Sequence, residues 1–359
     1  MSASRRRVVW ITLFVLFASC GSYLAFWPVS VDPEAWQPPP ARAWKPNDAL
    51  AGATWMHREL IGPEGVTFDA AGRIVTGLGD GRILRFAADG SGPAELIAKT
   101  GGRPLGLEYD GTGHLIVADA QKGLLSIGSD GKVTILATEA GGVPFGFADD
   151  LAIAQDGTIY FTDASTRWPV NKFKTDILEH RASGRLIVYS PATGKAEVML
   201  KGLYFANGVA LAPDESYLLV TETSSYRVRR VWLRGDAAGK NDVFADNLPG
   251  FPDNITWSKD RHAFWVAIGS PRDPLLDRLA SQPAARKLIA RLPELLQPAP
   301  RRHAWVLALD EHGKAVADLQ YVSPASYSPI ASVIERDGWL YLGSFMREGI
   351  ARVKAPPVP

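Results

Sequence analysis

Four oxygen-bearing side chains stand at the same position of a repeated hairpin pattern: Glu64, Asp149, Asn207 and Asp253. The pattern is a short apolar strand, a polar turn and a second apolar strand, so this position lies where a buried strand begins. No lysine, arginine or histidine occupies the position in any repeat. A buried carboxylate is costly unless its charge is compensated, and calcium prefers ligand sets of Asp, Glu and Asn oxygens. The pattern therefore predicts that the four residues converge on one calcium ion.

Each of these residues alone has a simpler explanation. An aspartate or asparagine at a strand entry often bonds only the local backbone, and Glu64 could be an ordinary turn residue. The shared position of all four is what favours a metal site. One step further along the chain, Asp150 and Asn254 are expected to point sideways, where they would support the ligands or supply an additional one.

Six hairpins carry the pattern, and they begin at Glu64, Leu105, Asp149, Asn207, Asp253 and Ile330. Apart from two longer intervals, they recur near the roughly 40 to 45 residues of a four-stranded propeller blade. The first strand of a blade is innermost, so the starting residues would lie near the central axis on one face of the disc. The sequence therefore predicts an all-β fold, a six-bladed β-propeller. Its ring would close by pairing "ATWMHREL" (53–60) with "GIARVKA" (349–355).

An uncharged run precedes the propeller. Residues 8–27 are long enough to cross a bilayer as a single N-terminal transmembrane helix, a signal-anchor. The basic tail of residues 1–7 should stay in the cytoplasm, which would place the propeller (51–359) on the periplasmic, luminal or extracellular side. The alternative is a cleaved signal peptide, because "FASC" (17–20) resembles a lipoprotein cleavage box. Residues 28–50 form a proline-rich linker, which is expected to be a stiff spacer that holds the propeller off the membrane.

Two long insertions are expected to overhang the metal as lids. They span residues 164–184 and 270–303. Within the second, residues 273–296 combine apolar side chains at helical spacing with several basic ones. This segment could lie in a membrane interface and recruit lipophilic substrate, or its apolar stripe could pack on the propeller rim.

Several long motifs resemble a known family. "FADDLAIAQDGTIYFTDASTRW" from Phe147, "NLPGFPDNITW" from Asn247 and "ERDGWLYLGSF" from Glu335 are similar to the strictosidine synthase-like and adipocyte plasma membrane-associated protein family, and more distantly to gluconolactonase and paraoxonase. The resemblance implies a six-bladed propeller. In the hydrolases among these proteins, Glu, Asn and Asp hold calcium at the axis. The matching positions here are Glu64, Asn207 and Asp253, with Asn254 beside them.

The sequence departs from its relatives at three positions. Asp149 stands where the hydrolases have asparagine, which adds a negative charge to the site. Ala331 stands where strictosidine synthase has its catalytic glutamate, and this argues against strictosidine synthase activity. Leu105 stands where paraoxonase has a histidine.

The sequence favours a calcium-dependent hydrolase of lactones or aryl esters. Calcium would act as a Lewis acid on a small lipophilic ester or lactone, and a carboxylate from Asp149 or Asp253 would deprotonate the attacking water. The membrane would be a partner through the N-terminal helix and the 273–296 insertion. A nucleic-acid partner is not expected, because the net charge is +1 and no basic patch is visible. The alternative is a non-catalytic, calcium-stabilised propeller that binds a lipid or protein partner.

Overall fold

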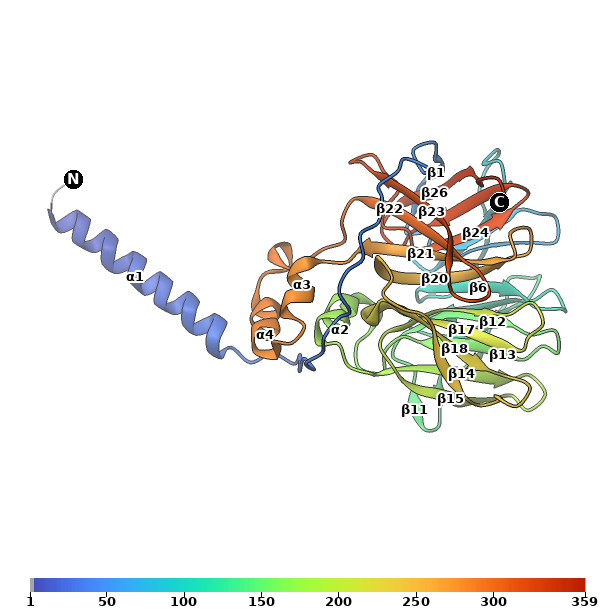
Figure 1. The fold of residues 1–359 in the computed structure, drawn as a ribbon, viewed down its shortest axis with the longest axis horizontal. Coiled ribbons are helices and arrows are strands. Elements are labelled where there is room, and N and C mark those ends of the chain that lie inside the picture. Colours follow the sequence, from blue (N-terminus) through green and yellow to red (C-terminus); the bar gives the residue numbers. More distant parts are fainter. Residues whose placement is uncertain (1–2, 359) are drawn as a thin grey trace.

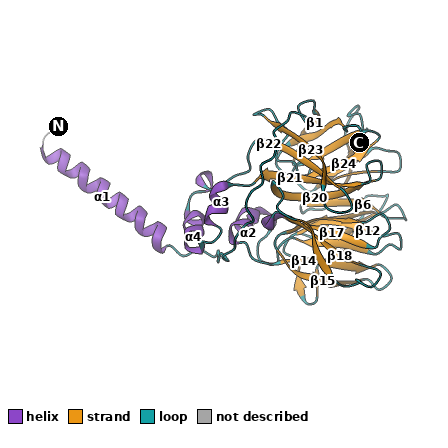
Figure 2. Cartoon of the chain, viewed as in Figure 1, coloured by secondary structure: helices purple, strands orange, loops and turns teal. Residues whose placement is uncertain are grey.

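Six four-stranded antiparallel sheets surround a central axis in the computed structural model, which describes residues 3–358 (Figures 1 and 2). The predicted six-bladed β-propeller is therefore confirmed. Residues 1–2 of the predicted basic tail and Pro359 at the end of the predicted propeller lie outside the described residues.

The first three blades follow one another along the chain. Blade one contains β2 (Val66–Phe68), β3 (Ile74–Gly77), β4 (Arg82–Phe86) and β5 (Glu95–Lys99). Blade two contains β6 (Pro104–Tyr109), β7 (Leu115–Asp119), β8 (Gly123–Ile127) and β9 (Val133–Ala137). Blade three contains β12 (Ala148–Ile153), β13 (Ile159–Asp163), β14 (Gly184–Ser190) and β15 (Lys195–Leu203). A small hairpin of β10 (Glu139–Ala140) and β11 (Val143–Pro144) precedes blade three.

The last three blades include the one that closes the ring. Blade four contains β16 (Ala206–Leu211), β17 (Tyr217–Glu222), β18 (Arg227–Trp232) and β19 (Asn241–Ala245). Blade five contains β20 (Gly250–Ser258), β21 (Ala263–Pro271), β22 (His303–Leu309) and β23 (Ala315–Val322). Blade six contains β24 (Ser332–Arg336), β25 (Trp339–Gly343), β26 (Glu348–Lys354) and β1 (Thr54–Ile61). The pairing of β1 with β26, in which Thr54 faces Arg352, confirms the predicted closure.

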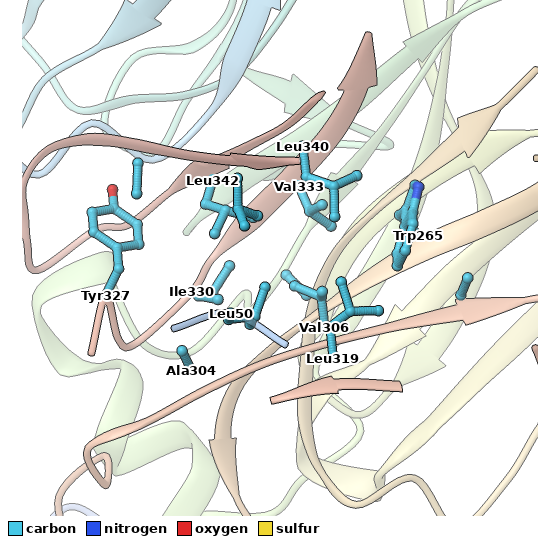
Figure 3. Close-up of a cluster of buried hydrophobic side chains, with 14 of the residues drawn as sticks. Leu50, Trp265, Ala304, Val306, Leu319, Tyr327, Ile330, Val333, Leu340 and Leu342 are labelled. Atoms are coloured by element: carbon cyan, nitrogen blue, oxygen red, sulfur yellow. The ribbon is translucent and has the colours of Figure 1, made fainter. Parts of the chain in front are cut away.

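Apolar side chains fill the space between neighbouring blades. Because each sheet is covered on both faces, a middle strand such as β7 is buried along its whole length. Between blades five and six, Trp265, Val306 and Val333 pack against Leu340 and Leu342 (Figure 3). The innermost strands of consecutive blades contact one another around the ring. This packing holds the starts of the inner strands close to the axis.

Both insertions form helices on one face of the propeller. The first contains the 3-10 turn η1 (Val170–Lys172) and α2 (Phe173–Glu179). The second contains α3 (Pro274–Leu279), α4 (Pro283–Arg291) and the turn η3 (Glu294–Leu296). Figure 1 shows α2, α3 and α4 between the propeller and α1 (Ala3–Phe26). Among the described residues, α1 is the one helix long and apolar enough to cross a membrane.

The segment of residues 28–50, called here the strap, lies along these helices. The backbone N–H of Asp32 donates to Glu179 Oε1 at 2.7 Å, and the Arg286 guanidinium donates to the carbonyl of Glu34. The Trp36 ring stacks on His180, with 4.0 Å between ring centroids. The strap therefore packs on the helices of the two insertions, whereas its prolines predicted a stiff spacer between the N-terminal helix and the propeller.

Candidate functional site

A cavity of about 370 Å³ opens on the propeller axis beneath the lid helices. Its floor includes Glu64, Asp149, Asn207 and Asp253, so the structure brings all four predicted ligands to one cavity. Leu105 and Ile330, which hold the same position in blades two and six, are fully buried in the core. The predicted neighbours Asp150 and Asn254 are also buried or half-buried beside this floor.

Local irregularities in the inner strands aim the site residues at the cavity. The pairing of β12 with β13 shifts between Ala148 and Leu151, which is where Asp149 lies. The pairing of β16 with β17 shifts in the same way around Asn207, and that of β20 with β21 around Asp253. A strand irregularity of this kind re-aims a side chain out of the regular alternation. The same device thus recurs in three blades.

Two threonines tie these irregular strands to the next blade. Thr162 Oγ1 accepts the N–H of Asp150 at 3.1 Å and donates to the carbonyl of Asn207. Thr221 Oγ1 accepts the N–H of Gly208 at 2.8 Å and donates to the carbonyl of Asp253 at 2.7 Å. The ligand-bearing backbones of blades three, four and five are therefore joined in series.

An acidic residue follows each of these threonines, and it anchors the loop that enters its own blade. Asp163 Oδ1 accepts the N–H of Phe147 at 2.9 Å, and Glu222 Oε1 accepts the N–H of Tyr204 at 3.2 Å. Both carboxylates are fully buried and are paired with arginines. This role was not predicted from the sequence. The motifs "YFTD" and "LVTE", which end the second strands of blades three and four, place a threonine and then an acidic residue at the same position in both blades. This repetition is the sequence pattern that indicates the role.

Four buried oxygens in or beside the cavity floor have no hydrogen-bond partner among the described residues: Asp149 Oδ1, Asn207 Oδ1, Asp253 Oδ1 and Asn254 Oδ1. Buried polar atoms are nearly always paired, so such a cluster requires an explanation. By contrast, Asp150 Oδ2 accepts the N–H of Val209 at 3.0 Å, which makes Asp150 a supporting residue. Two carboxylate and two amide oxygens are hard donors suited to calcium, and the residues present therefore fit that ion.

The carboxyl groups in the floor repel one another. Burial raises the pKa of Asp149 well above its usual range, and the neighbouring carboxylates of Glu64 and Asp253 raise it further. Burial, followed by the charge of Glu64, also raises the pKa of Asp253. A divalent cation among these groups would offset both the burial penalty and the repulsion.

Glu64 has a partner that was not predicted from the sequence. Arg103 Nη2 donates to Glu64 Oε2 at 3.2 Å, and Arg103 Nη1 donates to the carbonyl of Gly62 at 2.9 Å. Arg103 lies two residues before the aligned position of blade two, so the register gave no sign of it. Within residues 3–358, no group of three or more His, Cys, Asp or Glu side chains could by itself hold a metal ion. A metal site here must therefore use the amide oxygens as well.

Aromatic and aliphatic side chains form the walls of the cavity. Phe147 packs edge-to-face against Phe205 at 5.5 Å, and Phe173 of α2 packs in the same way against Phe345 at 5.3 Å. Leu276 of α3 and Ile289 of α4 close the wall from the second insertion. A polar floor beneath apolar walls is suited to a ligand with one polar group and a lipophilic body.

The lid contains a buried carboxyl group whose ionisation should lower stability. Asp176 of α2 accepts a long hydrogen bond from Ser183 Oγ at 3.3 Å, and its Oδ1 has no hydrogen-bond partner among the described residues. Burial raises the pKa of Asp176 to about 7. Because the folded state holds this proton more tightly than the unfolded state, its contribution to stability is full below about pH 4 and is lost as the pH rises to about 7.

The Asp176→Asn variant should therefore gain stability relative to the wild type as the pH rises. We expect little difference near pH 4 and an advantage on the order of 2 kcal/mol at about pH 8, measured by thermal unfolding across this range. Asp156→Asn is the matched control, because hydrogen bonds from Thr158 lower the pKa of Asp156, so the effect of this substitution on stability should not vary between pH 4 and pH 8. An advantage of Asp176→Asn that does not vary with pH would contradict the prediction.

Comparison with known proteins identifies the family. The chain matches the strictosidine synthase family over residues 149–236 and the N-terminal region of strictosidine synthase-like proteins over residues 43–86. It is 37% identical to strictosidine synthase-like protein 6 of Arabidopsis thaliana over 311 residues, which cover 85% of this chain and 82% of that protein. It is 34% identical to the human adipocyte plasma membrane-associated protein, over 92% of this chain and 85% of that protein.

Solved structures with the same fold are more distant in sequence. A gluconolactonase from Xanthomonas campestris superposes with a TM-score of 0.62 at 18% identity, over 92% of this chain and 99% of that chain. The calcium-binding protein regucalcin from Agrobacterium tumefaciens superposes with a TM-score of 0.56 at 16% identity, over 86% and 97%. These two structural similarities concern the fold alone. The sequence similarities to the Arabidopsis and human proteins, by contrast, extend over most of each protein. The chain belongs to the strictosidine synthase-like family.

Proposed function

We propose that this protein is a calcium-dependent hydrolase of lipophilic lactones or aryl esters. The observation that carries the proposal is the group of four unpartnered buried oxygens at the polar floor of an apolar cavity. Gluconolactonase and regucalcin, named as a lactonase and a calcium-binding protein, share the fold and so make this reading consistent. Ala331, fully buried, offers no carboxylate to support strictosidine synthase chemistry.

The side chains of the floor would hold both the ion and the substrate. Asp149, Asn207 and Asp253 would bind calcium through their free Oδ1 atoms, with Glu64 and Asn254 beside them. When bound, calcium would supply Lewis-acid polarisation of the substrate carbonyl. Of the acidic groups in the cavity floor, Asp149 and Asp253 each have a buried Oδ1 without a hydrogen-bond partner among the described residues, and one of the two would take the proton of the attacking water at Oδ2, the oxygen that does not bind the ion.

The cavity walls and the lid would select and deliver the substrate. Phe147, Phe205 and Leu276 would surround its lipophilic part and exclude bulk water from the floor. Arg291 of α4 donates to the carbonyl of Trp27 at 2.6 Å, one residue after α1, which ties the lid to the end of the proposed membrane helix. Leu295 and Leu296 beside it are 94% and 65% exposed. We propose that this part of the 273–296 insertion rests on the bilayer, so that substrate enters from the membrane, with the N-terminus in the cytoplasm.

Hydrolysis of a series of phenyl esters and lactones by the full-length protein tests this proposal. Turnover should be abolished by chelation and restored by calcium, and longer acyl chains should be favoured more strongly in phospholipid vesicles than in detergent micelles. A protein that turns over no member of the series, yet loses thermal stability on chelation, would instead be a calcium-stabilised binding propeller. If chelation changes neither turnover nor thermal stability, the calcium site is excluded.

A further inference from the structure

Arg103 places a permanent positive charge at the floor of the cavity. Its side chain is almost fully buried, and its guanidinium reaches the floor from blade two, which supplies no oxygen ligand of its own. Asp119 Oδ1 fixes the Arg103 backbone by accepting its N–H at 2.9 Å. With Nη1 bonded to the carbonyl of Gly62 and Nη2 to Glu64, the guanidinium is held at both ends. It is therefore a built part of the site.

Arg103 supplies the positive charge that a divalent cation would leave unmatched among the three carboxyl groups that line the cavity floor. Glu64, Asp149 and Asp253 together carry three negative charges when ionised, and a divalent cation supplies two positive charges. Lys174 also lines the cavity, but its ammonium is paired with Glu294 at 3.1 Å. Among the described residues, Arg103 is the basic side chain that bonds one of the three floor carboxylates. Its single charge makes the sum zero with a divalent ion bound, and leaves an excess positive charge with a trivalent one.

We infer that Arg103 is the positioning residue that sets the charge selectivity of the cation site. This inference rests on the proposed calcium site and adds to it. Arg103 donates to Oε2 of Glu64, which leaves Oε1 as the Glu64 oxygen without this contact. It also offsets the charge that Asp149 brings to the floor, so that the site prefers a divalent over a trivalent cation of similar size. Arg103 and Asp149 therefore compensate each other in charge, although no hydrogen bond joins them directly.

The ratio of terbium to calcium affinity measures this selectivity. Replacing Arg103 can disturb the position of Glu64, but such a disturbance lowers the affinity for both ions. The loss of the positive charge, by contrast, raises the affinity for the trivalent ion relative to the divalent one. Titration of the full-length protein in micelles with each metal alone, by calorimetry, should show the ratio rising at least about tenfold in Arg103→Met. The double variant Arg103→Met with Asp149→Asn should return to about the wild-type ratio, because one charge of each sign has been removed. Arg103→Lys, which keeps the charge and loses the forked contact, should stay near the wild-type ratio.

Controls separate the inference from folding and from the proposed function. Arg85→Met removes an arginine that pairs with Glu95 on the outer part of blade one, and it should leave the ratio unchanged. Circular dichroism and the melting temperature establish that each variant is folded. If the wild type binds calcium but the ratio does not change in Arg103→Met, the inference is wrong and the calcium site stands. If calcium binds only after Arg103 is replaced, the guanidinium occupies the place of the ion, and both proposals are overturned.

Discussion

Replacement of Asp253 by asparagine is expected to lower calcium affinity by at least about 100-fold and to abolish turnover. Asp253 supplies one of the two carboxylate oxygens in the cavity floor that have no other partner among the described residues. The substitution removes its charge and presents either a weaker oxygen or an N–H₂ group to the ion. Calorimetric titration and steady-state hydrolysis would measure the two effects.

Asp130→Asn is the control for this substitution. Asp130 lies in an exposed turn of blade two and accepts the N–H of Lys132 at 3.0 Å, so the same chemical change is made far from the cavity. Its calcium affinity and turnover should equal those of the wild type. Retention of calcium binding by Asp253→Asn would remove Asp253 from the ligand set. Loss of turnover with unchanged calcium binding would assign Asp253 to the proton transfer alone.

Replacement of Glu222 by glutamine should cause the largest loss of stability, about 3 kcal/mol. Glu222 is fully buried and accepts hydrogen bonds from Arg227 Nε at 2.6 Å and Arg229 Nε at 2.9 Å. It also accepts the N–H of Tyr204, in the loop that leads to Asn207. Glutamine keeps the size but leaves two guanidinium groups without their counter-charge and turns an N–H₂ group toward one of them. Urea unfolding would measure the loss.

Glu95→Gln provides the surface comparison. Glu95 is half-exposed and accepts Arg85 Nε at 2.8 Å, a distance similar to those at Glu222. Its loss should cost less than about 1 kcal/mol, because solvent screens an exposed ion pair. Equal effects of the two substitutions would show that the buried cluster in blade four adds nothing to stability. A second readout is calcium affinity, which should fall in Glu222→Gln because the loop before Asn207 is released.

The repeat and the register could be predicted because both are local and periodic. Strands that are buried on both faces appear in the sequence as short runs of apolar residues, and the polar turns between them recur at the interval of a blade. The closure of β1 on β26 could be anticipated in the same way, since both ends of the chain carried an unpaired strand pattern. The convergence of Asp149, Asn207 and Asp253 on one cavity follows from this geometry alone.

The contacts that the sequence analysis missed are not periodic. Arg103 reaches Glu64 from outside the aligned position, through a long side chain whose direction no strand pattern specifies. The strap is held by side-chain bonds to backbone carbonyls, such as Arg272 to Pro39 at 2.7 Å, and such bonds leave no compositional trace. The composition of a proline-rich segment predicts a stiff, extended chain, but it does not indicate the surface against which that chain packs.

The closure of the ring also fixes when this domain can finish folding. The strand β1 begins at Thr54, but its partner β26 ends only at Lys354, so the sixth blade cannot form until almost the whole chain has been synthesised. At roughly 5 to 20 residues per second, β1 waits without a partner on the order of 15 to 60 seconds. During that time its edge is open to pairing with other chains. Early association of the neighbouring strap with the growing blades would keep β1 close to the place where its partner arrives.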